Sequence, residues 1–414
     1  MVRPRFLALR TNAPAAAPRW GWAASGSEFV IRHDPATGRS TGKADGEPAR
    51  IWDDPLDALR WIGSMDLADL PYRGGRWVGY LSYDLGRRFE RLPAIPPDDL
   101  GMPLFAFALA GEAGRDPPVG PVEPPPLPAF VAPPAAVVMS TFGRAGYLAA
   151  VARAIEYVRA GDVFQVNLSQ RLAVPWPRPS ADLFHRLADL GGARYGALLD
   201  FGDFALVSNS PELFFRVDPL PDGRRRITSR PIKGTRPRRP GMDRELLASE
   251  KDKAELTMIV DLQRNDLGRI CEVGTVKVTE PRMIEAHPTV YHGVATIEGI
   301  LRPCVGFVDI LRAMFPCGSV TGCPKVRAME VIDELEPVAR GPYCGAIGWV
   351  GADGAMEFNV AIRTTVVKDG LAYVPVGGGI VADSDPAAEY EETLTKAAAT
   401  LAALGVSVND LRLP

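Results

Sequence analysis

The sequence lacks the features of a membrane or secreted protein. No stretch approaches the ~20 uninterrupted apolar residues that a membrane-spanning helix needs. The N-terminal Met-Val-Arg-Pro-Arg is not followed by the apolar run of a signal peptide. An excess of charge is also missing, because 47 Lys and Arg stand against 50 Asp and Glu. A nucleic-acid surface needs a concentrated basic patch, so we expect neither a membrane nor a nucleic acid among the partners.

Cysteine and histidine are scarce, with five and four residues in a chain of 414. The number of cysteines is odd, and none forms a Cys-x-x-Cys pair. This pattern argues against a disulfide framework and favours reduced thiols in a cytoplasmic protein. Cys317 and Cys323, with so few histidines, make a poor zinc site.

Proline is concentrated in one place. The composition as a whole, 46% hydrophobic and 23% charged, is that of a globular protein with a large core or two. The stretch 116–134 is rich in proline and contains three consecutive prolines at 124–126. Such runs remove backbone donors and favour an extended chain. We predict a linker over 116–139 between an N-terminal region, 1–115, and a larger domain, 140–410.

Hydrophobic periodicity predicts a mixture of helices and strands. Leu148, Val151, Ile155 and Val158 fall on one face of a helix that Gly161 stops. Over 162–172, alternation places Phe164, Val166 and Leu168 on the apolar face of a strand and Gln165, Asn167 and Ser169 on a polar face. Strands 204–208 and 213–217 are expected to pair through a turn at 209–212.

Further elements follow in runs rather than in strict alternation. We expect helices around 245–262, from near 324 and over 386–404, and strands around 76–83, 346–350 and 360–367. Asp385 is a predicted helix cap, with Pro386 at the first helical position. Runs of strands and runs of helices favour an α+β fold with antiparallel sheets.

Two predicted helices carry acidic residues three positions apart. Asp252 and Glu255 share one helix face, and Glu389 and Glu392 share another. Two such faces turned toward each other would hold a hard divalent cation, for which Mg²⁺ is suited. By spacing alone, the pattern favours two solvated helix faces over a metal site.

Glycine and lysine mark the other candidate positions. The triple glycine 377–379 and the loop 318–324 each precede a predicted helix, where backbone amides attract anions. A tight turn is the alternative for the triple glycine. Lys233 lies between Pro231 and Pro237 beside a glycine. A lysine held on a rigid, desolvated segment can act as a nucleophile, and the alternative is an ordinary surface charge.

Taken in order, these segments resemble the signature blocks of the chorismate-utilising enzymes. The blocks include Pro-Ile-Lys-Gly-Thr and Met-Ile-Val-Asp-Leu-Gln-Arg-Asn-Asp, and they lie at 164–171, 210–212, 231–235, 258–266, 318–329, 377–384 and 389–396. The resemblance is strong over about 140–405. It implies two antiparallel sheets packed as a sandwich, flanked by helices, with the site between the sheets.

The resemblance also implies roles for single residues. Mg²⁺ would be held by Glu255 and Glu392 with Asp252 and Glu389 in support. Chorismate would be bound by Tyr343, Arg363, Gly378, Gly379, Thr321 and Gly322. His292 would lie near the leaving hydroxyl as a proton donor or electrostatic helper, and the family often has a second histidine where Tyr291 stands. Lys233, Glu212 and Gln165 complete the catalytic set.

Two positions distinguish branches of the family. The enzymes that add water to chorismate carry a lysine where Gln165 stands, and an amide cannot serve as that base. Anthranilate synthases usually have alanine where Lys233 stands, whereas lysine there is typical of the branch that aminates carbon 4 to give 4-amino-4-deoxychorismate. Because no glutaminase domain is visible, a glutamine amidotransferase subunit would supply ammonia. The alternatives are an anthranilate synthase component I and an inactive chorismate-binding protein.

Overall fold

The fold was obtained as a computed structural model. It describes residues 6–11, 20, 22–24, 27, 29–44, 48–64, 75–110 and 138–407. The predicted linker, 116–139, therefore lies outside the described residues except for its last two positions. The five cysteines are all free, as the sequence predicted. Within the described residues, no helix combines the length and the apolar character needed to cross a membrane.

Strands of the described chain form two antiparallel sheets. The first, sheet A, has nine strands in the order β17-β9-β21-β20-β11-β10-β1-β2, with β8 beside β9. Its bounds are β17 Gly322–Cys323, β9 Gln165–Pro175, β21 Leu371–Ile380, β20 Thr364–Lys368, β11 Ala205–Ser210, β10 Tyr195–Asp200, β1 Phe6–Arg10, β2 Trp22–Ala24 and β8 Met139–Ser140.

The second, sheet B, has twelve strands in the order β14-β16-β13-β12-β19-β18-β6-β7-β3-β4-β5, with β15 beside β16. Its bounds are β14 Ile232–Pro237, β16 Val290–Ile300, β13 Arg225–Arg230, β12 Leu213–Pro219, β19 Met356–Val360, β18 Ala346–Gly351, β6 Arg76–Leu81, β7 Phe105–Ala110, β3 Phe29–His33, β4 Ser40–Ala44, β5 Arg50–Trp52 and β15 Lys277–Ala286. Strands from the predicted N-terminal region thus pair within both sheets, and the predicted division at the linker stays a prediction.

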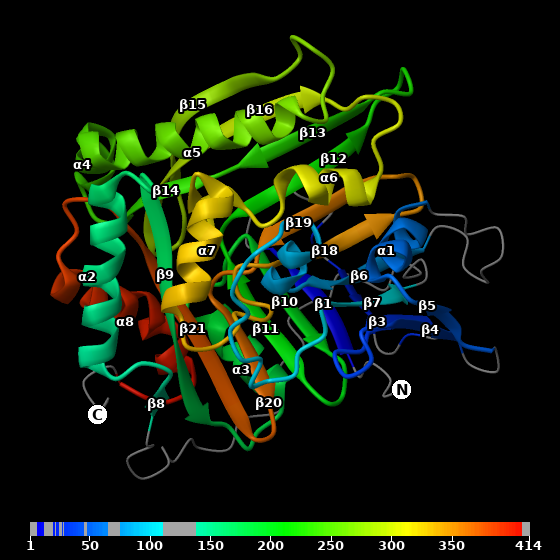
Figure 1. Ribbon diagram of the computed structural model, residues 1–414, viewed down its shortest axis with the longest axis horizontal. Coiled ribbons are helices and arrows are strands. Elements are labelled where there is room, and N and C mark those ends of the chain that lie inside the picture. Colours follow the sequence, from blue (N-terminus) through cyan, green and yellow to red (C-terminus); the bar gives the residue numbers. More distant parts are fainter. Residues whose placement is uncertain are drawn as a thin grey trace.

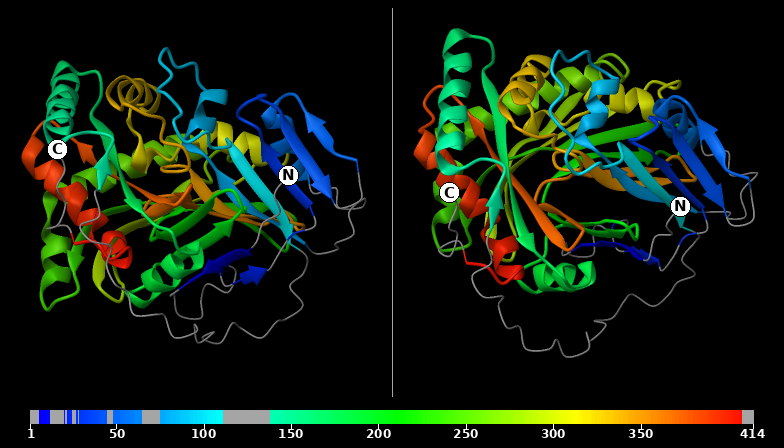
Figure 2. Two further views of the ribbon diagram at one scale, coloured as in Figure 1. Left: turned by 90° about the horizontal axis from the view of Figure 1, so that it is seen from below. Right: turned by 60° about the horizontal axis from the view of Figure 1, so that its bottom comes forward.

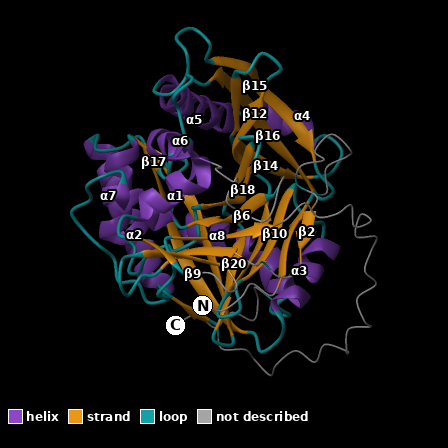
Figure 3. Cartoon of the chain, turned by 90° about the vertical axis from the view of Figure 1, so that its right-hand side faces the viewer, coloured by secondary structure: helices purple, strands orange, loops and turns teal. Residues whose placement is uncertain are grey.

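Helices lie around the sheets (Figures 1 and 3). Helices α2 Arg144–Ala160, α8 Pro386–Ala403, α3 Ser180–Asp189 and α7 Lys325–Leu335 pack on sheet A. Helices α4 Met242–Ala248 and α5 Glu250–Gly268 pack on sheet B, and α1 Pro55–Ser64 packs on sheet B and on α6 Phe307–Met314. Two short 3-10 helices, η2 Tyr83–Arg88 and η3 Gly318–Val320, complete the described elements.

The core confirms the sandwich. One buried cluster joins side chains of sheet A, such as Leu199 and Leu206, to side chains of sheet B, such as Tyr80 and Trp349. Other clusters fill the space between each sheet and its helices. Figure 2 shows the sheets facing each other with the helices outside. The α+β class with two antiparallel sheets flanked by helices is therefore the observed fold.

Several local predictions are confirmed. Helix α2 ends at Gly161, which adopts a left-handed φ of 84° that a glycine tolerates. Asp385 caps α8 by accepting a hydrogen bond from the Ala388 amide at 2.9 Å. Strand β9 appears where alternation placed it, although Phe164, assigned to its apolar face, is 70% exposed just before the strand begins.

Two expectations about strand connections are wrong. The strands around 204–208 and 213–217 do not form a hairpin, because β11 belongs to sheet A and β12 to sheet B. Pro211, at the crossing between them, has no backbone donor for a hairpin ladder. The triple glycine does not form a tight turn either, since it lies inside β21 and pairs with 167–169 of β9.

Candidate active site

Lys233 is the centre of the candidate site. It projects from β14, its side chain is 14% exposed, and its Nζ lies 3.9 Å from Glu255 Oε2 of α5. Burial lowers the pKa of Lys233, while the charges of Glu255, Glu212 and Glu392 oppose that shift. Carboxylates from three separate parts of the chain therefore act electrostatically on one desolvated amine. An amine in such surroundings is closer to its neutral, nucleophilic form than an exposed lysine is.

Glu212 lies just before β12 and is 3% exposed. Burial raises its pKa to about 7, against the effects of a Ser319 hydrogen bond and of Lys233. Its Oε1 is buried and has no hydrogen-bond partner among the described residues. A carboxyl group that titrates near neutrality and keeps an unpaired oxygen is suited to proton transfer.

The four acidic residues predicted to bind metal have different partners. Glu392 Oε1 lies 2.7 Å from Lys396 Nζ, and Glu389 Oε1 accepts from the Ser384 hydroxyl at 2.6 Å. Asp252 pairs with Arg236 at 3.1 Å. Burial acts to raise the pKa of Glu392, but Lys396 and other lysines hold it below its usual value.

The carboxylate oxygens of these residues are of the kind that Mg²⁺ binds, but the side chains are not arranged around one point. The described residues contain no group of three or more His, Cys, Asp or Glu side chains placed to hold a metal. Yet the charges of Glu255 and Glu392 both raise the pKa of Lys233. At Gly378, the absence of a Cβ lets the backbone lie close to the acidic residues of α8. A Cβ at Gly378 would lie 3.1 Å from Glu389 Oε2 and 3.7 Å from Glu392 Oε1. Lys396 Nζ also lies 3.7 Å from that Cβ position, so these carboxylates, which are ligands of the kind that Mg²⁺ takes, would hold the ion in place of their contact with Lys396.

Gln165 and the glycines form the opposite wall. Gln165 is 2% exposed, and its Nε2 is buried without a hydrogen-bond partner among the described residues. A Cβ at Gly379 would come within 2.1 Å of that Nε2, so the close approach requires glycine. Gly322 has a φ of 147°, and a Cβ there would come within 2.2 Å of the Gln165 carbonyl oxygen. The hydroxyl of Thr321 donates to the Cys317 carbonyl at 3.0 Å, which fixes this wall.

His292 lies in β16 and is 2% exposed. Its Nδ1 is 2.9 Å from the Thr235 hydroxyl, and its ring centroid is 4.9 Å from that of His287. Burial lowers the pKa of His292 to about 3, and the charges of His287 and Arg363 act in the same direction. The imidazole is therefore neutral, so it is suited to donate a hydrogen bond rather than to carry a charge.

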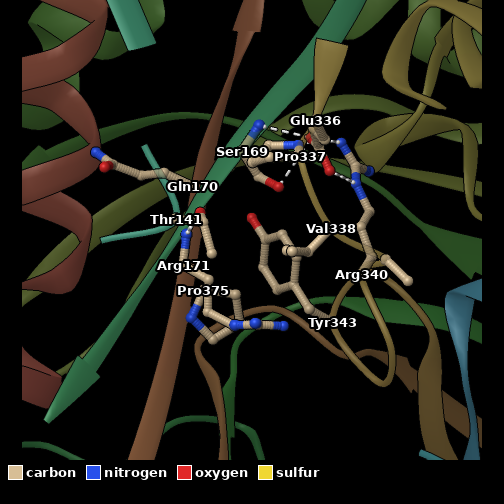
Figure 4. A pocket seen from close by; sticks show the side chains of 11 residues that line it. Thr141, Ser169, Gln170, Arg171, Glu336, Pro337, Val338, Arg340, Tyr343 and Pro375 are labelled. Carbon is tan, nitrogen blue, oxygen red and sulfur yellow. Dashed lines mark hydrogen bonds and ion pairs between the residues drawn. The ribbon is translucent and has the colours of Figure 1, made fainter. Parts of the chain in front are cut away.

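Arg363 and Tyr343 occupy less regular backbone. Arg363 has a φ of 48°, rare for a residue with a side chain, and strain of this kind is common at binding sites. Its guanidinium has no ion pair with any described carboxylate. Tyr343 borders a cavity of about 20 Å³ together with Arg340, Glu336 and Ser169 (Figure 4). Glu336 and Arg340 form a buried ion pair there at 2.6 Å.

Sequence reasoning missed several neighbours of these residues. The spacing of Lys396 from Glu392, one helical turn, was sufficient to find that pair. Thr235 stands two residues from Lys233 on the same strand, but alternation could not place it, because the register shifts between Ile232 and Thr235. His287 and Ser319 had no local signal, because their contacts depend on which strands and loops pack together.

Three comparisons describe what the chain is similar to. The family model for chorismate binding enzymes matches residues 24–402. Anthranilate synthase component 1 of Thermus thermophilus is 43% identical over 390 residues, covering 85% of this chain and 82% of that protein. Aminodeoxychorismate synthase component 1 of Salmonella typhimurium is 38% identical over 385 residues, covering 87% and 83%. The crystal structure of anthranilate synthase component I from Streptococcus pneumoniae superimposes with a TM-score of 0.76 at 30% identity, over 96% of this chain and 92% of that one.

Proposed function

The chain belongs to the family of chorismate binding enzymes, and from this premise we propose that it aminates chorismate at carbon 4. The product would be 4-amino-4-deoxychorismate, a precursor of 4-aminobenzoate and folate. Ammonia would come from a glutamine amidotransferase subunit, and the reaction would take place in the cytoplasm with Mg²⁺.

The observation that carries this proposal is the buried amine of Lys233 beside three carboxylates. In the proposed first step, Lys233 Nζ bonds to ring carbon 2, both ring double bonds shift, and the hydroxyl leaves carbon 4. In the second step, ammonia bonds to carbon 4, the double bonds shift back, and the lysine leaves carbon 2. Holding the amine on a rigid strand saves the entropy of a diffusing nucleophile.

The other residues have supporting roles in this proposal. Glu212, with a pKa of about 7, would give a proton to the leaving hydroxyl, and His292 would donate a hydrogen bond to it. Arg363, Tyr343 and the amides of Gly378 and Gly379 would bind the substrate's carboxylates, for which a guanidinium is well suited.

Glu255 and Glu392 would hold Mg²⁺, with Asp252 and Glu389 in support. The metal would neutralise the ring carboxylate of the substrate. Gln165 would line the pocket where the water-adding relatives carry their base, and Thr321 and Gly322 would shape the wall behind it.

A second function is supported by a specific observation. Relatives that share as much as 43% of their residues with this chain are named anthranilate synthase component 1. In that reaction nitrogen enters at carbon 2, the position that Lys233 would occupy in our proposal. An inactive chorismate-binding protein is a weaker alternative, because the acidic pairs, Lys233 and His292 are all present.

The test is the identity of the product. The purified chain is incubated with chorismate, Mg²⁺ and ammonium at high pH, where free ammonia is abundant, and the products are separated with and without an added aminodeoxychorismate lyase. We expect 4-aminobenzoate only when the lyase is present, and no amination with glutamine alone. Fluorescent anthranilate without the lyase would favour the second function, and unchanged chorismate would favour the inactive alternative.

A further inference from the structure

His292 is held between two neighbouring strands. In the sheet it stands opposite Thr235 of β14 on one side and Glu285 of β15 on the other. Residues directly opposite each other place their side chains on the same face. Tyr291, the next residue in β16, therefore points to the other face. The imidazole that packs against His292 therefore comes from another part of the chain.

His287 supplies that imidazole from the turn after β15. Its backbone amide donates to the Val290 carbonyl at 2.8 Å, which fixes the turn. Its ring meets the ring of His292 edge to face, with 4.9 Å between centroids and 66° between planes. Aromatic rings favour this arrangement.

Glu285 holds His287 in turn. The Nε2 of His287 lies 3.7 Å from Glu285 Oε2, and that buried nitrogen has no hydrogen-bond partner among the described residues. Oε1 of Glu285 accepts from Arg230 at 2.5 Å, and Arg194 donates to Oε2, the oxygen that faces His287, at 3.3 Å. Arg230 and Arg194 therefore hold Glu285 in place, and Glu285 in turn contacts the imidazole of His287.

We infer that His287 is a positioning residue, whose ring, anchored by Glu285, holds the imidazole of His292 in one orientation. An imidazole can rotate about its last bond and exchange its two nitrogens. The contacts of His292 with the Thr235 hydroxyl and the Gly234 carbonyl set one orientation, and the packed ring of His287 restricts rotation out of it. The groups that face His292 are Thr235 and the Gly234 carbonyl from β14, His287 and Glu285 from β15 and its turn, and Arg363.

The kinetic part of this inference rests on the proposed function, since it assumes that His292 assists turnover. In His287→Ala, kcat for chorismate with ammonium should fall about tenfold while KM stays within about twofold, because geometry and not binding is lost. His287→Phe keeps the ring packing and should retain most of the activity. His185→Gln on α3, whose ring contacts Phe184, is the matched control and should change nothing.

Histidine NMR tests the inference without any turnover. The chain has four histidines, so each signal can be assigned by substitution. Wild-type His292 should stay neutral, as one tautomer, down to about pH 5. In His287→Ala its titration should move to higher pH and its tautomers should mix. An unchanged His292 titration and tautomer in a folded His287→Ala protein would overturn the inference, whatever product the wild type makes. The inference would also be overturned if the fall in kcat of His287→Ala were explained entirely by a smaller fraction of folded protein.

Discussion

The wall of the site from sheet A and the wall from sheet B differ in whether their polar side chains have hydrogen-bond or ion-pair partners. On the wall from sheet A, Gln165 Nε2 and Asn167 Nδ2 are buried donors without partners in the described part of the chain, and Arg363 forms no ion pair with a carboxylate there. On the wall from sheet B, Thr235 pairs with His292 and Arg236 pairs with Asp252. Unpaired donors require an acceptor-rich ligand, so the first wall is suited to a substrate with carboxylates. The second wall carries Lys233, the proposed nucleophile, and Glu212, the proposed acid, whose Oε1 is a buried acceptor without a partner among the described residues.

This comparison also explains why the proposed metal would join the walls. Glu255 belongs to α5 on the sheet B side, and Glu392 belongs to α8 on the sheet A side. The charges of both carboxylates raise the pKa of Lys233. The lysine and a cation would therefore compete for the same carboxylates, and binding of the cation would release the amine.

The largest effect is expected from changing the nucleophile on the sheet B wall. Lys233→Arg keeps the positive charge but cannot supply a neutral amine, so kcat should fall about a thousandfold or more. Lys233→Ala should also lose most 4-aminodeoxychorismate and release some product aminated at carbon 2. Lys253→Arg, an exposed lysine on α5, is the control. Full activity in Lys233→Arg would reduce Lys233 to an electrostatic anchor.

Removing one carboxylate from either wall should have the next largest effect. Glu255→Gln and Glu392→Gln should each lower kcat about a hundredfold or more while the circular dichroism spectrum is unchanged. Chelator should abolish wild-type activity, and added Mg²⁺ should restore it. The neighbours Glu250→Gln and Glu391→Gln provide exposed controls on the same helices. Wild-type activity in excess chelator would refute the metal assignment.

Blocking the sheet A wall should weaken binding more than chemistry. In Gly379→Ala, the new methyl group would meet Gln165 Nε2 at 2.1 Å, so KM for chorismate should rise about tenfold or more as the glutamine is displaced. Gly268→Ala, where no atom lies within 4 Å, should behave as wild type. An unchanged KM in Gly379→Ala would separate Gln165 from the substrate pocket.

The smallest effect concerns stability rather than rate. Because burial raises the pKa of Glu212 to about 7, the folded protein binds more protons than the unfolded chain between the ordinary value of 4.5 and 7. Stability from this group is present at low pH and is lost as pH rises toward 7. Glu212→Gln should remove that loss. The melting temperature of the variant minus that of the wild type should therefore increase as pH is raised from about 5 to about 8. A difference that does not vary with pH would contradict the assignment.

Local signals predicted much of the fold because they act over a few residues. The cap at Asp385 and the stop at Gly161 were accessible in this way. The connection from β11 to β12 was not, because alternation cannot tell whether two strands share a sheet. The same limit hid the contact of His287 with His292, which depends on the register of β15 against β16. The resemblance indicated the candidate site residues, but only the fold shows that Lys233 is buried near carboxylates.

The most direct test of the account is to trap the first step. Wild-type protein is mixed with chorismate and Mg²⁺ without ammonia or glutamine, quenched in acid and digested, and the peptide that contains Lys233 is analysed by mass spectrometry. The account predicts an adduct on Lys233 with the mass of chorismate less one water, absent from Lys233→Arg and lost when ammonium is added before quenching. A wild-type enzyme that forms 4-amino-4-deoxychorismate with no adduct at any time, together with an active Lys233→Arg variant, would contradict it.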